Sequence, residues 1–84
     1  GGNMPDRKLY RRLRVELGLR DISQADLAKA INRSPYYVFL RMSGKDSWTL
    51  YEAFTILALI GDNSLTFADL FPVDDVMGGV RRGA

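Results

Sequence analysis

The sequence predicts a compact all-α domain of five helices. Three observations lead to this class. Apolar residues recur at spacings of three and four, which is the period of an amphipathic helix. Ser and Thr residues that can cap a helix stand just before several of these segments. No segment shows the alternation of apolar and polar residues that is typical of a strand.

The first helix is expected over residues 5–19. Pro5 suits a first helical turn, where its missing N–H is not needed. The apolar stripe of this helix consists of Leu9, Tyr10, Leu13 and Leu17. Its other faces carry two rows of cations, which are Arg7, Arg11 and Arg14 in one row and Lys8 and Arg12 in the other. These rows could approach a DNA backbone or simply keep a small domain in solution.

The second helix is expected to begin near Gln24 and to end at Asn32. Ser23 and Asp26 stand three residues apart, as in a capping box with Asp in place of Glu. Asn tolerates the left-handed backbone conformation that closes many helices. Only a short turn then separates this helix from the next one.

The third helix is expected from about Pro35 to Ser43. Ser34 supplies an N-cap hydroxyl, proline suits the first helical position, and Gly44 stops the helix.

The fourth helix follows Thr49 and Glu52, which form a full capping box, and it ends at Gly61. Trp48, just before this helix, is expected to pack over the core rather than to anchor a partner.

A short fifth helix, "FADLF", follows Thr66 and Asp69, which repeat the capping pattern, and Pro72 terminates it. Residues 73–84 show no periodicity and end in Gly, Arg and Ala, so we expect a flexible C-terminal tail there.

Composition excludes several classes of function. The sequence has no Cys and no His, so it lacks the commonest general base, the commonest metal ligand and any thiolate. We therefore expect no catalytic residue, no metal site and no cofactor. The longest apolar run, "AFTILALIG", is far shorter than the roughly 20 residues of a membrane span, so we expect a cytoplasmic protein with no membrane partner. Residues 1–3 resemble a cloning remnant, and residues 4–72 form the expected domain.

Charge is unevenly distributed along the chain. Residues 1–45 contain ten Lys and Arg against four acids, a balance of +6, whereas residues 46–84 contain two Arg against six acids, a balance of −4. A half-basic domain indicates one surface that faces a polyanion. A solvated basic face is the alternative explanation, and charge alone does not separate the two.

Two short helices joined by a turn, with Ala28 in the first and Ser-Pro at the start of the second, form a helix-turn-helix pattern. The small residue suits the point where such helices cross. With "SQADLAKAIN", "RSPYYVFLRMSGK", "TLYEAFTILALIG" and "LTFADLF" in this order, residues 9–71 resemble the phage repressor and Cro-like (XRE family) helix-turn-helix domains. The resemblance implies a five-helix lambda-repressor-like fold that inserts its third helix into the major groove of DNA.

The resemblance also assigns positions at the DNA. Base-reading positions of the family fall on Ser34, Pro35, Tyr36, Phe39 and Leu40, and the buried position of the family falls on Val38. The expected phosphate contacts are Gln24, Arg33, Tyr37, Ser43 and Lys45. Tyr37 is open to two interpretations, because it could cover the edge of the core and also reach a phosphate with its hydroxyl.

This sequence departs from the family pattern in three ways. Asn32 replaces the glycine that is usual in the turn, which is harmless because both residues accept the left-handed conformation. Arg41 occupies a position that is usually apolar, and since Met42 can fill the core instead, the register of the third helix stays open by one residue. The base-reading positions lack the Arg, Asn or Gln that make bidentate contacts to guanine or adenine. Tyr36, Phe39 and Leu40 can touch a thymine methyl or stack, or they can form an apolar face that docks a protein.

The expected function is sequence-specific binding of double-stranded DNA by a Cro-like transcriptional regulator encoded by a phage or prophage. A homodimer is expected through the region of the fifth helix, which carries an apolar surplus in Leu65, Phe67, Leu70, Phe71 and Val73. Such a dimer would place two recognition helices about 34 Å apart and prefer a pseudo-palindromic operator. The competing hypothesis is a protein-interaction module that docks a partner through the "YYVFL" face.

Overall fold

The computed structural model describes residues 9–77. Within this range the chain forms six helices and no strand: α1 (Arg11–Leu19), α2 (Gln24–Ala30), α3 (Pro35–Met42), α4 (Leu50–Ile60), α5 (Phe67–Leu70) and α6 (Val73–Val76). The all-α prediction is confirmed, but the expected number of five helices is wrong. None of the described helices is both long enough and apolar enough to cross a membrane.

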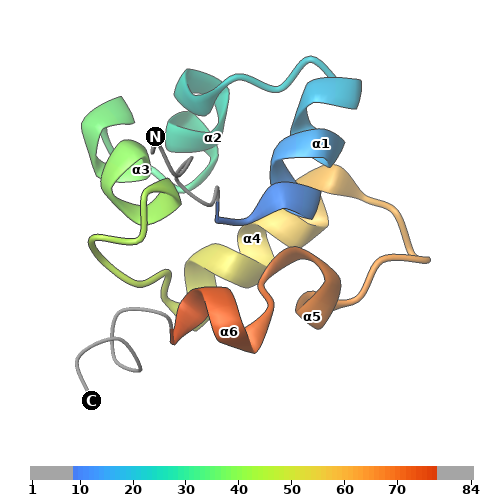
Figure 1. Cartoon of the computed structure of the whole chain (residues 1–84). Helices are drawn as coiled ribbons and strands as arrows, with labels where there is room; N and C mark the ends of the chain where they lie inside the picture. The colour runs from blue at the N-terminus through green and yellow to red at the C-terminus, as the bar shows by residue number, and fades with distance from the viewer. Residues whose placement is uncertain (1–8, 78–84) are drawn as a thin grey trace, which may run out of the picture.

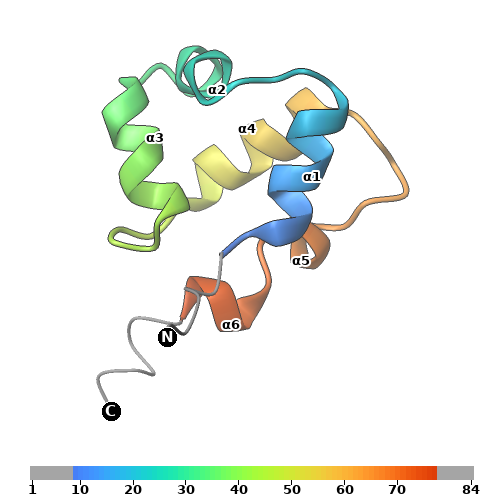
Figure 2. The ribbon, with the colours of Figure 1, turned by 45° about the horizontal axis from the view of Figure 1, so that its top comes forward.

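Helix α4 lies in the middle of the fold (Figures 1 and 2). Helices α2 and α3 lie on one side of it, and α5 and α6 lie on the other. Helix α2 packs against both α3 and α4, while α5 packs against α1 and α4. The pair formed by α2 and α3 is therefore attached to the rest of the domain mainly by the packing of α2 against α4.

The helix starts follow the capping residues that the sequence predicts. Three reciprocal capping boxes begin α2, α4 and α5, formed by Ser23 with Asp26, Thr49 with Glu52, and Thr66 with Asp69. The Ser34 hydroxyl accepts a hydrogen bond from the backbone N–H of Tyr37 and begins α3. Each bond satisfies a backbone donor that an uncapped helix would leave without a partner.

The start of α1 differs from the prediction. Tyr10 precedes the helix with a left-handed backbone, φ 57°, so Leu9 and Tyr10 lie outside it. The Tyr10 side chain is buried in the core, and its backbone N–H donates to the Asp75 carboxylate at 2.9 Å. These contacts compensate for the cost of a non-glycine residue at positive φ. The predicted helical residues Pro5, Arg7 and Lys8 lie outside the described residues.

The first part of the expected tail is helical. Residues 73–76 form α6, whose Asp75 is buried and accepts the hydrogen bond from Tyr10. Val76 packs against the core. The prediction of a flexible tail is therefore wrong for these residues, because a contact with a residue 65 positions earlier holds the segment in place. Residues 78–84 of that predicted tail lie outside the described range.

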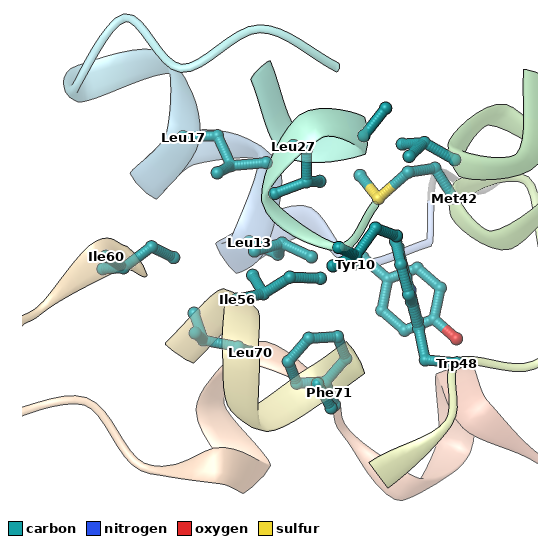
Figure 3. Close-up of a cluster of buried hydrophobic side chains, with 14 of the residues drawn as sticks. Tyr10, Leu13, Leu17, Leu27, Met42, Trp48, Ile56, Ile60, Leu70 and Phe71 are labelled. Atoms are coloured by element: carbon teal, nitrogen blue, oxygen red, sulfur yellow. The ribbon is translucent and has the colours of Figure 1, made fainter. Parts of the chain in front are cut away.

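The core brings together side chains from all parts of the described chain (Figure 3). It is formed chiefly by Tyr10, Leu13, Leu17, Leu27, Met42, Trp48, Ile56, Ile60, Leu70 and Phe71. Phe71 meets Tyr10 and Trp48 edge to face, with ring centroids 6.0 and 6.1 Å apart. Trp48 covers the core as predicted.

Candidate nucleic-acid interface

Helices α2 and α3 form a tightly joined pair. Ala28 is buried, and its carbonyl accepts a hydrogen bond of 2.8 Å from the backbone N–H of Arg33 in the turn. Asn32 adopts the left-handed conformation, φ 61°, that the sequence predicts for the end of α2. The bend at Asn32 lets a second helix begin at Pro35 with little intervening chain. Two short helices joined by a tight turn are therefore present where the sequence predicts them.

One face of α3 is buried and the opposite face is exposed. Val38 and Met42 point into the core and are almost inaccessible to solvent. Tyr36 is 67% exposed and Phe39 is 49% exposed, and their rings stack with centroids 6.1 Å apart. The register that the sequence left open is therefore settled, with Val38 and Met42 inside and the aromatic pair outside.

The remaining predicted base-reading residues differ in accessibility. Ser34 and Pro35 are exposed at the start of α3, but the Ser34 hydroxyl is engaged as the helix cap. Leu40 is only half-buried, so part of its side chain is available. The exposed face of α3 thus consists mainly of Tyr36 and Phe39.

The predicted phosphate contacts lie at both ends of α3 and at the start of α2. Gln24 is exposed at the first position of α2, and Arg33 is exposed in the turn. Ser43 and Lys45 are exposed after α3, and the Ser43 hydroxyl and the Lys45 backbone N–H both donate to the Leu40 carbonyl. The turn after α3 is therefore held in a defined shape.

Tyr37 is half-buried, and its hydroxyl has a partner within the domain. The hydroxyl donates a hydrogen bond to the Glu52 carboxylate at the start of α4. The proton that a phosphate contact would use is therefore already shared with a carboxylate. Of the two interpretations of Tyr37, the structure places the side chain at the edge of the core, facing α4.

Arg41 explains how a charged residue can occupy a usually apolar position. Its guanidinium lies over the Tyr37 ring, 3.8 Å from the centroid, and pairs with Asp46 at 3.0 Å. It also lies 3.9 Å from Glu52. Burial opposes ionisation of Glu52, but hydrogen bonds from Tyr37 and Thr49 and the charge of Arg41 hold its pKa below the ordinary value. Glu52 is therefore a carboxylate at neutral pH.

No family model, curated protein or solved structure matches this chain. The assignment of a function therefore depends on the geometry of the chain itself. Among residues 9–77, no group of three or more His, Cys, Asp or Glu side chains is arranged to hold a metal ion.

Several arginines of the basic half have structural roles. Arg12 and Arg20 both pair with Glu16, at 2.7 and 2.6 Å, and their hydrogen bonds lower the pKa of that carboxyl. Arg14 donates to the Leu9 carbonyl at 2.7 Å and to the Met42 carbonyl at 2.9 Å, which ties α1 to the end of α3. The charge imbalance of the sequence therefore overstates the number of cations that could contact a polyanion.

The sequence reasoning missed the group formed by Tyr37, Arg41 and Glu52. Tyr37 and Arg41 are four residues apart on one helix, a spacing that indicates a shared face. Glu52 comes from another helix, and its capping role was a sufficient explanation for its presence. No local pattern connects it to Tyr37.

Proposed function

We propose that this domain binds double-stranded DNA and acts as a sequence-specific transcriptional regulator, with α3 in the major groove. One observation carries the proposal: α3 is fixed by buried Val38 and Met42 while its opposite face is exposed between Arg33 and Lys45. A rigid exposed helix with a cation near each end suits a groove bounded by phosphates. The phage or prophage Cro-like class and a place in the bacterial cytoplasm belong to this proposal.

Tyr36 and Phe39 would be the main base-facing residues, with Ser34, Pro35 and Leu40 beside them. A phenyl ring can contact a thymine methyl, and a tyrosine hydroxyl can make one hydrogen bond to a base edge. Gln24, Arg33, Ser43 and Lys45 would contact phosphates. Discrimination between sequences would be modest, because no side chain on this face makes a bidentate base contact.

The role of Lys45 gives a direct test. We expect Lys45→Ala to weaken binding to every duplex by a similar factor and to lower the slope of log K against log salt by about one, because one phosphate contact is lost. Fluorescence anisotropy with an A·T-rich and a G·C-rich duplex at several salt concentrations measures both quantities. Lys29→Ala, an exposed lysine in the last turn of α2, is the matched control. A loss confined to one sequence would contradict the phosphate role.

We also propose a homodimer, through a surface that overlaps the expected region of the fifth helix only in part. Three of the apolar residues expected at this surface, Leu65, Leu70 and Phe71, are buried in the chain's own core. Exposed apolar side chains lie instead at the start of α4 and on α6, where Leu50 is 67% exposed and Val73 is 62% exposed.

Leu50 also lines an apolar pocket. The pocket has a volume of about 200 Å³ and is lined by Trp48, Thr49, Leu50, Ala53, Phe67, Phe71 and Val76. The buried indole N–H of Trp48 has no hydrogen-bond partner among the described residues. A second copy could cover the apolar rim, and two-fold symmetry would present the same surface on both copies.

Leu50→Glu tests this dimer surface. Glutamate is well tolerated at the first position of a helix, so the fold should be retained while a carboxylate is placed in the interface. We expect the dimer dissociation constant from sedimentation equilibrium to rise by about tenfold or more, as expected for an interfacial charge without a partner. Val15→Glu, at an exposed apolar site on α1 outside the pocket lining, is the control. Equal effects of the two substitutions would contradict the proposed surface.

A second candidate function is favoured by the same exposed aromatic pair. Tyr36 and Phe39 form a stacked apolar surface that could dock a protein. In that case substitutions of either residue would disrupt a protein complex, and the domain would show little affinity for DNA even at low salt.

A further inference from the structure

We propose that Tyr37 and Glu52 form a platform that positions Arg33 for contact with a phosphate, so that Tyr37 acts on DNA through Arg33 rather than by its own hydroxyl. This inference rests on the proposed DNA-binding function. It assigns Tyr37 and Glu52 as positioning residues and Arg33 as the residue that meets the anion.

Glu52 is the fixed base of the platform. Its side chain is buried, with only 4% of the residue exposed. One carboxylate oxygen accepts from the Thr49 backbone N–H at 3.1 Å, as the capping box of α4 requires. The other oxygen accepts from the Tyr37 hydroxyl. Rotation of the tyrosine away from this position would leave a buried carboxylate oxygen without its donor, which is costly.

The Tyr37 ring is held from a second direction by Arg41. The Arg41 guanidinium lies 3.8 Å from the ring centroid, and its own position is fixed by the ion pair with Asp46. Asp46 and Glu52 together offset the charge of Arg41. Arg41 therefore supports the ring and is poorly suited to bind an additional anion.

Arg33 is the cation that the platform leaves available. Its guanidinium lies 4.9 Å from the centroid of the Tyr37 ring, within the range of a cation–π interaction. Within residues 9–77 this guanidinium forms no ion pair, so the ring contact restricts an otherwise exposed side chain. A long side chain that is already ordered loses less conformational entropy when it binds a phosphate.

The decisive experiment is a double-mutant cycle between Tyr37 and Arg33, measured as affinity for a random-sequence duplex over a salt series. We expect Arg33→Ala to weaken binding by about five- to tenfold and to lower the salt slope by about one. Tyr37→Leu should weaken binding by about two- to fivefold on its own, as expected for the loss of an exposed cation–π contact, but should leave the affinity almost unchanged when Arg33 is already alanine.

Two further variants separate positioning from folding. Tyr37→Phe keeps the ring but removes the hydrogen bond to Glu52. It should therefore cause a smaller loss of duplex affinity than Tyr37→Leu, and this loss should disappear when Arg33 is already alanine. Tyr36→Leu removes the neighbouring ring, which stacks on Phe39, and its effect should be the same in both backgrounds. If both Tyr37 variants lower duplex affinity by the same factor with Arg33 present and with Arg33 replaced by alanine, the platform is overturned.

A measurement without DNA distinguishes failure of the platform from failure of the proposed function. The NMR order parameter of the Arg33 Nε–H bond should fall in Tyr37→Phe and fall further in Tyr37→Leu, while Tyr36→Leu leaves it unchanged. An Arg33 guanidinium that is equally ordered in all variants would overturn the platform. Absence of duplex binding by the unmodified protein would instead overturn the proposed function.

Discussion

Phe39→Glu is expected to weaken binding to any duplex by roughly 100-fold or more, because it places a negative charge on the face of α3 that would meet DNA. Phe39 is half-exposed in the free domain and its ring contacts only that of Tyr36 among the aromatic side chains described. The substitution should therefore change the melting temperature little. Anisotropy titration and thermal unfolding by circular dichroism measure the two effects separately.

Tyr51→Glu is the matched control for this prediction. Tyr51 is an exposed aromatic residue on α4, so the substitution introduces the same charge at a site outside α2 and α3. We expect duplex affinity to fall only slightly in this variant. If both substitutions weaken binding equally, the effect reflects net charge, and the assignment of α3 to the groove is wrong.

Leu13→Ala is expected to lower the free energy of unfolding by about 2–5 kcal/mol. Leu13 is fully buried where α1 meets the centre of the core (Figure 3), and truncation removes its packing and leaves a cavity. A domain of this size has a small reserve of stability, so part of the population could be unfolded at 37 °C. Urea denaturation followed by circular dichroism gives the value.

The exposed leucine at the end of the same helix provides the comparison. Leu19 is largely exposed, so Leu19→Ala should change the free energy of unfolding by no more than about 0.5 kcal/mol. Similar losses for both leucines would show that the packing of α1 against the core differs from the arrangement described above.

The helix starts could be predicted from sequence because their causes are local. Helices α2, α4 and α5 each begin with a capping box. In each box the capping hydroxyl and the carboxylate belong to residues three positions apart. Asn32 and Gly61 likewise adopt the left-handed conformations that their residue types favour at helix ends. Signals within one helical turn need no knowledge of the tertiary fold.

The errors at the two ends of the described chain have one non-local cause. Tyr10 leaves the helical conformation and Asp75 becomes buried because the two residues contact each other. Neither residue carries a local signal for this contact. The amphipathic pattern of the first segment correctly indicated that Leu9 and Tyr10 pack on the core, but it could not show that they do so from outside the helix.

The candidate site was predictable in outline and not in detail. The resemblance implied that Val38 is buried, and its side chain does lie in the core. Tyr37 and Glu52 lie on different helices and meet only in the folded domain. Arg12 and Arg20 both pair with the same acid, Glu16. Charge counts therefore overestimated the basic surface.

The most direct test of the central claim is the affinity of the unmodified protein for a random-sequence duplex, measured by fluorescence anisotropy between about 50 and 200 mM salt. Binding by α3 in the major groove predicts a dissociation constant in the micromolar range at low salt that rises steeply as salt is added. Absence of binding at the lowest salt concentration would contradict the DNA-binding function and favour a protein-docking role for the Tyr36 and Phe39 face.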